Sequence, residues 1–534
     1  MIVIRGAEVY NPSQGNVAQL RDLWIDGERI IDPPPVPTDV QEIDGRGKII
    51  APAGVEIHTH VAGYPLNAAR RFMLIEGSEP HTLIPSPDEA ASLYLQMGYT
   101  TIFDAASSPL FARATIKDLD HLSGVDRGTY TLMGDHTLLI ENLVKNDLSA
   151  VRDILAWLIH VSGGYAVKLV NPGGGLAWKA GKQAPDLDSP LGMGNLTQRE
   201  IIRTIVKIVN DLGLPHPVHL HACKLGEPGN FSSFCETIRA LEGQHAHLCH
   251  IQFFCYGKDD SGGFTSQAEQ VAQTLESFPQ ITCDVGQIMF GSAMAVSADT
   301  SALSLLHQHS KQPWISRQVE CEGGNNILPL QYKAKDLTSS VQWATGLELL
   351  LRFPDPTRMF LTTDHPNGAP FTAYPQIIAW LMNSSARQEI LKQMHPKIRE
   401  RSGLADIERE YSLGEIFAMT SYGPAKALGL QDRGHLDPGA LADIRCYTKR
   451  DDIKAMFEKP AWVMRRGEIV IENGKQIKQQ SGNTLITRPA WDETRLPYIR
   501  AELADHLSFP VDQYALGDSS IPDVLEVPCT STTS

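Results

Sequence analysis

The chain has 534 residues, and its 47 Lys and Arg against 62 Asp and Glu give a formal net charge of −15. This length excludes a small scaffold held together by disulfides, and the acidic balance argues against nucleic acid or an anionic membrane surface as the main partner. The hydrophobic fraction of 42% is typical of a globular protein with a large core.

The sequence does not indicate secretion or membrane insertion. Its opening stretch, MIVIRGAEVYNPSQG, lacks a basic segment followed by an apolar run, and no run of about 18 uncharged apolar residues occurs. The 8 Cys form no C-x-x-C pair and lie mostly beside apolar residues, as reduced buried thiols do. We therefore expect a cytoplasmic protein without a membrane span, and its Cys and Met content favours a mesophilic source.

Both ends of the chain read as short strands joined by Gly turns. MIVIRG, DLWIDGERI and EIDGRGKIIAP lie in residues 1–50, and LDPGALADIRCYT and WVMRRGEIVIENGKQI lie in residues 431–480. Because neither piece has room for many helices, we predict one small β-sandwich domain assembled from both chain ends.

The middle of the chain, residues 51–430, alternates apolar β-branched runs with amphipathic helices. The helical segments SPDEAASLYLQMG, TQREIIRTIVKIVNDLG and SQAEQVAQTLESF each open with Ser or Thr and an acidic residue or glutamine about three positions later. This repetition predicts an α/β fold, a (β/α)₈ TIM-like barrel. We interpret the Pro-rich residues 481–534 as a docking segment or tail that carries Trp491, Tyr498, Phe509 and Tyr514; the alternative is that they wrap their own domain.

The strongest chemical signal is EIHTHV, in which His58 and His60 share one face of the first barrel strand. Two imidazoles placed in this way can bind one metal ion. The alternative, a pair of structural histidines at a strand end, is disfavoured because the chemistry of a barrel lies at the carboxyl ends of its strands.

Lys168 lies in the otherwise apolar strand YAVKLV, where desolvation of an ammonium group is costly. Carboxylation by CO₂ would turn this side chain into an anionic ligand with two oxygens that can bridge two metal ions. The alternative is a lysine at a strand edge whose ammonium reaches solvent.

Further candidates end other apolar strands: His219 and His221 in HPVHLHAC, His250 in HLCHIQFF, and Asp364 in FLTTDHP. Each alone is more often structural than ligating. Together with His58 and Lys168, their spacing matches strands 1, 4, 5, 6 and 8 of a barrel that uses about 30 residues per βα unit, with insertions. We therefore expect all of them at one barrel mouth.

This pattern of H-x-H, Lys, His, His and Asp resembles the ligand set of the amidohydrolase superfamily, whose split β-sandwich around a barrel is similar too. The strings IHTHVAG, VKLVNPGGG, CDVGQIMFG, VECEGGNNILP and TTDHPN further resemble the A subunits of formylmethanofuran dehydrogenases and of the bacterial formyltransferase/hydrolase complex. The mesophilic composition and the opening LRDLWIDGERI favour the bacterial complex.

The resemblance implies roles for these residues. His58 and His60 would bind a first zinc ion, His221 and His250 a second, N6-carboxylated Lys168 would bridge both, and Asp364 would contact the first. Two such ions lower the pKa of bound water, and Asp364 would move the proton from this nucleophile to the leaving amine. Asn67 and Arg70, in the loop after the first strand, match an N-x-x-R pattern and would contact the substrate, unless they form a solvated loop; His219 would support the site.

The leading hypothesis is a binuclear zinc amidohydrolase that releases formate from the N-formyl group of a formylmethanofuran-type one-carbon carrier, as the A subunit of a formyltransferase/hydrolase complex with its other subunits. The alternatives are the hydrolytic subunit of a formylmethanofuran dehydrogenase beside a Mo/W redox subunit, and a cyclic amidase of the dihydroorotase or hydantoinase kind. A non-catalytic scaffold is disfavoured, because all six ligand positions hold competent side chains. Manganese or cobalt suits such a site as well as zinc.

Overall fold

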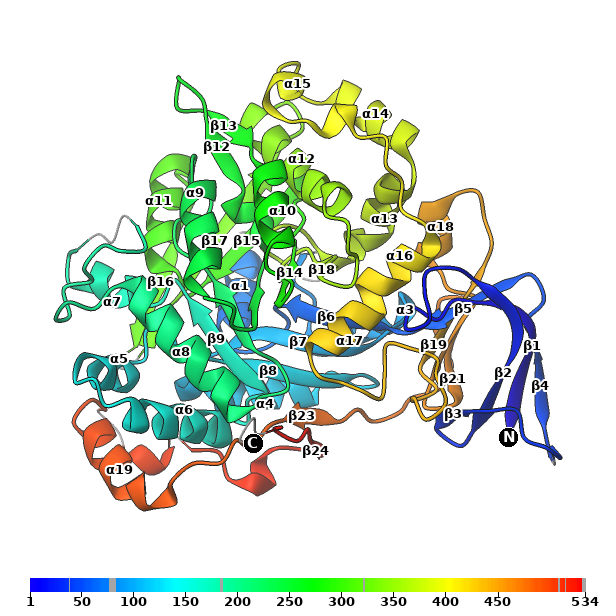
Figure 1. Ribbon diagram of the computed structural model, residues 1–534, viewed down its shortest axis with the longest axis horizontal. Coiled ribbons are helices and arrows are strands. Elements are labelled where there is room, and N and C mark those ends of the chain that lie inside the picture. The colour runs from blue at the N-terminus through cyan, green and yellow to red at the C-terminus, as the bar shows by residue number, and fades with distance from the viewer. Residues whose placement is uncertain are drawn as a thin grey trace.

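The computed structural model describes residues 1–530 apart from 38, 76–82, 183–185, 320–321, 508–509 and 514. A large α/β barrel occupies most of the molecule, and strands from both chain ends form a second sheet at its side (Figure 1). Among the described residues, no helix is long and apolar enough to cross a membrane.

Eight parallel strands form the barrel and are hydrogen-bonded in chain order. A parallel bridge between Thr59 and His365 brings the first strand beside the chain that follows the last one. The predicted (β/α)₈ architecture is therefore confirmed. The strands are β6 (Gly54–Thr59), β7 (Tyr99–Ser107), β8 (Asp126–Leu132), β9 (Ala166–Val170), β10 (Val218–His221), β11 (Ala246–Leu248), β14 (Ile281–Asp284) and β18 (Met359–Phe360).

Helices follow the barrel strands along the chain and bury their apolar faces in the core. They include α1 (Tyr64–Ile75), α3 (Pro87–Gln96), α4 (Ala112–Asp120), α5 (Thr137–Val144), α6 (Leu148–Ser162), α7 (Gly174–Lys179), α8 (Gln198–Leu212), α9 (Phe231–Ala240), α10 (Ala268–Glu276), α12 (Leu337–Arg352), α13 (Tyr374–Met382) and α14 (Ser384–Gln393). Ser86 and Thr197 form the predicted capping boxes of α3 and α8. Helix α10 begins after Gln267, whose side chain makes no capping hydrogen bond, and Ser266 Oγ accepts a hydrogen bond from the Ala268 N–H at 3.3 Å.

The two chain ends meet in one continuous nine-stranded sheet. Strand β5 pairs antiparallel with β19, so that Ile50 lies opposite Cys446. Side chains from both ends, among them Ile4, Ile25 and Met464, share one buried core. The remaining strands of this sheet are β1 (Ile2–Val9), β2 (Gln19–Asp26), β3 (Arg29–Ile31), β4 (Gln41–Asp44), β20 (Trp462–Arg465), β21 (Glu468–Glu472) and β22 (Lys475–Gln476), with β5 at Lys48–Pro52 and β19 at Ile444–Thr448.

An insert between barrel strands β14 and β18 forms a separate three-stranded antiparallel sheet that the sequence analysis did not predict. Its strands follow the order β15-β17-β16, and its helix α11 contacts β17. The elements are β15 (Gly291–Ser297), α11 (Thr300–Ser310), β16 (Ile315–Val319) and β17 (Glu322–Tyr332).

The C-terminal segment wraps its own barrel. Strand β23 (Thr484–Ile486) pairs in parallel with the start of β8, β24 (Val524–Glu526) pairs with β23, and α19 (Leu496–Ala504) follows on the outside (Figure 1). Trp491 and Tyr498 pack partly buried against the main core, while Phe509 and Tyr514 lie outside the described residues. This packing is the alternative that the sequence left open, and a docking role of the segment stays a prediction.

A buried ion cluster joins the barrel to the terminal sheet. Asp126, the first residue of β8, lies 2.7 Å from Arg433 and 2.6 Å from Arg465, and all three side chains are almost fully buried. Arg466 and the backbone N–H of Asn483 also contact this carboxylate. Burial alone raises the pKa of Asp126, but the guanidinium groups outweigh it and hold the pKa well below its usual range.

We expect Asp126→Asn to lower the free energy of unfolding by roughly 3–5 kcal/mol, because it leaves buried guanidinium groups without their anion. Denaturant titration measures this loss. Asp44→Asn is the matched control, since Asp44 pairs with Arg46 on the exposed surface, where solvent screens the pair, and its loss should be far smaller. Equal small losses in both variants would show that the cluster does not hold the two parts together.

Candidate metal centre and active site

The structure brings all six predicted ligand residues to the carboxyl ends of the barrel strands. His58 lies in β6, Lys168 in β9 and His221 at the end of β10, while His60, His250 and Asp364 follow β6, β11 and β18. All except His58 line one cavity of about 710 Å³. His58 is fully buried behind them.

Three of these side chains converge on one point. Asp364 Oδ1 lies 3.0 Å from His58 Nε2 and 3.2 Å from His60 Nε2. Ligand atoms about 2.0–2.1 Å from one tetrahedral zinc ion lie roughly 3.3 Å apart, so this trio fits a metal ion. Burial raises the pKa of Asp364, but the His250 and His58 imidazoles outweigh it and hold the pKa well below its usual range, which keeps the carboxylate ionised.

His221 and His250 form the second group. Their ring centroids lie 4.7 Å apart, and His221 Nε2 and His250 Nδ1 are buried without a hydrogen bond among the described residues. Gly286 passes directly behind His250: its φ is +69°, and a Cβ there would lie 2.5 Å from the His250 Cβ. Glycine at this position lets the imidazole reach the barrel mouth. Two imidazoles set edge to face at the barrel mouth suit a divalent metal.

Lys168 lies within the barrel, with 2% of its surface exposed. Its Nζ donates a hydrogen bond to Cys249 Sγ at 3.0 Å. The charge of this lysine acts on His58, His221 and His250 alike, so its side chain is in electrostatic reach of both groups. A carbamate on Nζ would retain one N–H for the sulfur, and carboxylation stays a prediction.

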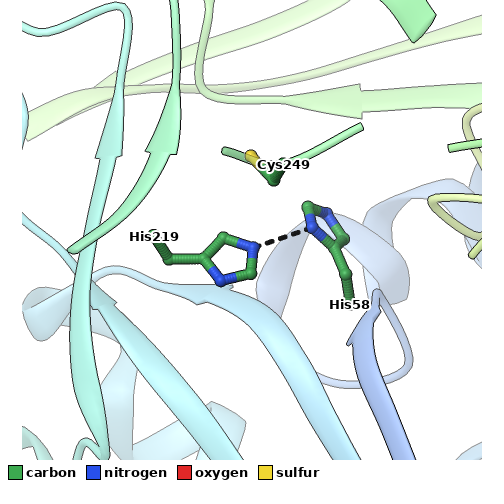
Figure 2. A group of neighbouring side chains, drawn as sticks. All are labelled: His58, His219 and Cys249. Atoms are coloured by element: carbon green, nitrogen blue, oxygen red, sulfur yellow. Dashed lines mark hydrogen bonds between the residues drawn. The ribbon is translucent and has the colours of Figure 1, made fainter. Parts of the chain in front are cut away.

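Figure 2 shows His58 with His219 and Cys249, a second set of ligand atoms close enough to share an ion. His219 Nε2 lies 2.9 Å from His58 Nδ1, whereas His58 Nε2 is the atom that meets Asp364. The structure thus places His219 against a predicted ligand, where it can orient the His58 ring.

Asp284, at the end of barrel strand β14, was missed by the sequence analysis. Its Oδ2 lies 3.1 Å from both His58 Nδ1 and His247 Nε2, and its Oδ1 accepts hydrogen bonds from the His250 backbone N–H and the Thr362 hydroxyl. One carboxylate therefore braces residues from both candidate metal groups. The signal was present, because the aspartate closes the apolar strand ITCD as His221 closes its own.

Asn67 and Arg70 lie on helix α1 rather than in a loop, so the loop placement expected from the sequence is wrong. Asn67 Nδ2 donates to Asp118 at 2.8 Å, and Arg70 donates to Asn67 Oδ1 and to the carbonyls of Val61 and Pro85. These contacts tie the start of α1 to its surroundings. A contact of either side chain with substrate stays a prediction.

The walls of the cavity are mainly apolar, and the insert supplies many of them. Lys168 is the one Lys or Arg among the described residues that line this cavity. An apolar wall excludes water and strengthens electrostatic interactions at the barrel mouth. The apolar lining includes Leu66, Leu132, Leu225, Phe253, Phe264, Val296, Leu303, Leu306 and Leu330.

Asp135, which follows barrel strand β8, predicts a pH dependence of stability. Burial raises the pKa of this carboxyl to about 7, and it accepts a hydrogen bond from the Gly175 N–H. The Asp135 carboxyl has a pKa near 4 in the unfolded chain. Between about pH 4 and pH 7 it is therefore ionised in the unfolded chain and protonated in the folded chain, so the free energy of unfolding falls as pH rises. Asp135→Asn should remove this fall, worth on the order of 2–4 kcal/mol.

Unfolding free energies at pH 5 and pH 8 test this expectation. The difference between the two pH values should shrink in Asp135→Asn by most of that amount. Asp355→Asn serves as control, because Asp355 caps a turn by accepting from the Thr357 N–H away from the barrel mouth. An unchanged pH dependence in Asp135→Asn would show that Asp135 is ionised in the folded chain at neutral pH.

Known proteins of the same architecture match almost the whole chain. The profile of the Amidohydrolase family matches residues 41–477. The chain is 36% identical over 535 residues to the A subunit of the formyltransferase/hydrolase complex Fhc of Methylorubrum extorquens, covering 97% of each chain, and 34% identical to protein FwdA of Methanocaldococcus jannaschii, covering 90% of each.

A solved structure agrees with this. The crystal structure of the formyltransferase/hydrolase complex FhcABCD from Methylorubrum extorquens with methylofuran contains a chain that superposes with a TM-score of 0.94 at 34% identity, covering 99% of this chain and 100% of that one. The resemblance inferred from the motifs is thereby confirmed. On its fold, its converging ligand residues and these matches, the chain belongs to the amidohydrolase family of metal-dependent hydrolases.

Proposed function

We propose that this protein is a binuclear zinc amidohydrolase that cleaves the N-formyl group of a formylmethanofuran-type carrier to formate and the free amine, as the A subunit of a formyltransferase/hydrolase complex. The observation that carries the proposal is the convergence of His58, His60 and Asp364 in a chain 36% identical to the Fhc A subunit across nearly its full length. The predicted cytoplasmic location belongs to the same proposal.

The residues of the site would have different roles in such a reaction. His58, His60 and Asp364 would hold one ion and His221 and His250 the other, with carboxylated Lys168 between them. When bound, divalent ions polarise the formyl carbonyl and lower the pKa of water. Asp364, ionised and 3.2 Å from His60, accepts the proton of the attacking water and returns it to the leaving amine. The apolar cavity walls exclude bulk water meanwhile.

Purification of the complex through a tag on this chain tests the proposal. We expect about two zinc ions per chain, co-purifying subunits of a formyl-handling complex, and formate release from an N-formylated furfurylamine carrier. The Asp364→Asn complex, purified in parallel, controls for contaminating amidases. A metal-loaded complex that hydrolyses a cyclic amide such as dihydroorotate and not the formamide would overturn the assignment of the substrate.

The similarity to FwdA favours a second candidate, the hydrolytic subunit of a formylmethanofuran dehydrogenase beside a Mo/W redox subunit. The two candidates share the hydrolytic site and differ in the partner. Mass spectrometry of the same purified complex separates them, because a redox subunit would bring molybdenum or tungsten with it.

A further inference from the structure

The insert between β14 and β18 brings a carboxylate, Asp299, to the barrel mouth. Asp299 directly precedes helix α11 and has 3% of its surface exposed. One of its oxygens is fully engaged: Oδ1 accepts hydrogen bonds from Asn171 Nδ2 at 3.0 Å, from the Ser301 hydroxyl at 2.8 Å and from the Ala302 N–H at 3.1 Å. Three donors on one oxygen fix the orientation of the carboxylate.

The other oxygen is directed at a predicted metal ligand. Asp299 Oδ2 lies 3.4 Å from His221 Nε2, and neither atom makes a hydrogen bond among the described residues. Both side chains are buried, so solvent does not satisfy these atoms. Capping of α11 needs only Oδ1 and therefore leaves the placement of Oδ2 unexplained.

An imidazole that gives one nitrogen to a carboxylate has one nitrogen left for a metal ion. His221 lines the cavity, so Nδ1 is the nitrogen left for an ion held there. His58 has the same arrangement with its two nitrogens exchanged: Nδ1 lies 3.1 Å from the Asp284 carboxylate, and Nε2 lies 3.0 Å from Asp364, its predicted partner in the first metal site. Metal-binding histidines commonly donate their second N–H to a carboxylate, which selects the tautomer and holds the ring.

We propose that Asp299 is the positioning residue of the second metal site: it accepts the Nε2–H of His221 and so directs the Nδ1 lone pair to the ion. This inference rests on the proposed binuclear function. Coordination at Nδ1 would strengthen Nε2–H as a donor to Asp299 Oδ2, which lies 3.4 Å away. Because Asp299 belongs to the insert, the element that walls the cavity also sets the affinity of the second site.

Two substitutions separate positioning from helix capping. Asp299→Asn keeps an N-cap acceptor and nearly the same shape but removes the anion, and Asp299→Ser keeps a capping oxygen that is too short to reach His221. Zinc titration of the metal-stripped chain, followed by metal analysis, should show the second site weakened about 10–100-fold in both variants. Cobalt-loaded protein should show a changed visible spectrum, a signal that capping alone does not alter.

Asp452→Asn is the matched control, because Asp452 caps α18 (Ile453–Glu458) by accepting from the Ala455 N–H far from the cavity. It should keep two ions at wild-type affinity. If Asp299→Asn and Asp299→Ser bind both ions as the wild type does, Asp299 only caps α11 and the inference is wrong. If Asp299→Ser does not fold, zinc titration of Asp299→Asn alone tests the inference. A wild-type chain that binds no second ion would overturn the binuclear function itself.

Discussion

Replacement of Lys168 by alanine should reduce bound metal from about two ions per chain to fewer than one and lower turnover at least roughly 10³-fold. The side chain is buried and acts electrostatically on His58, His221 and His250, so a carbamate on Nζ lies where a single anion can serve both metal groups. Without this anion the two ions would have fewer ligands, and their mutual repulsion would no longer be offset. Metal analysis and a formate assay measure the two effects.

Short carboxylic acids sharpen this test. Acetate or propionate that fills the space left by Lys168→Ala should restore part of the metal content and activity, as expected if the lysine supplies two carboxylate oxygens. Lys207→Ala is the control, since Lys207 forms an exposed pair with Asp211 on α8. Full metal content and full turnover in Lys168→Ala, without any added acid, would contradict the binuclear arrangement.

The barrel could be predicted because its strands leave a strong local signal. Strand β9, AVKLV, is a near-continuous apolar run apart from Lys168, and β10 and β11 are apolar apart from buried histidines, as expected for parallel strands buried on both faces. The insert escaped prediction because Gly291–Ser297 reads like another barrel strand, and local sequence does not say which sheet a strand joins. Strand β23, three residues in a Pro-rich segment, is too short to show any periodicity.

One rule predicted most of the candidate site: a polar side chain at the end of an apolar strand points to the barrel mouth. His221, His250 and Asp364 follow that rule, and Asp284 follows it too without having been singled out. Asp299 does not follow it: in the sequence it is an ordinary helix cap. Only the folding of the insert over the barrel brings its carboxylate to His221.

Asp364→Asn should lower turnover by roughly 10²–10⁴ while the chain keeps its fold and most of its metal, because an amide cannot accept the proton that hydrolysis transfers. The substitution is nearly isosteric. Asn367 Nδ2 donates to Asp364 Oδ1 at 3.0 Å, and the amide oxygen of the variant can still accept this bond. Retained metal is therefore expected, and kcat should fall much more than KM rises.

Metal content separates the two roles that Asp364 can have. If Asp364→Asn lost its ions together with its activity, the carboxylate would act chiefly as a ligand, as its contacts with His58 Nε2 and His60 Nε2 allow. If it kept both ions and lost turnover, proton transfer would be its main contribution. Near-wild-type formate release with both ions bound would remove Asp364 from the chemistry. The Asp355→Asn control, away from the barrel mouth, should match the wild type in every measurement.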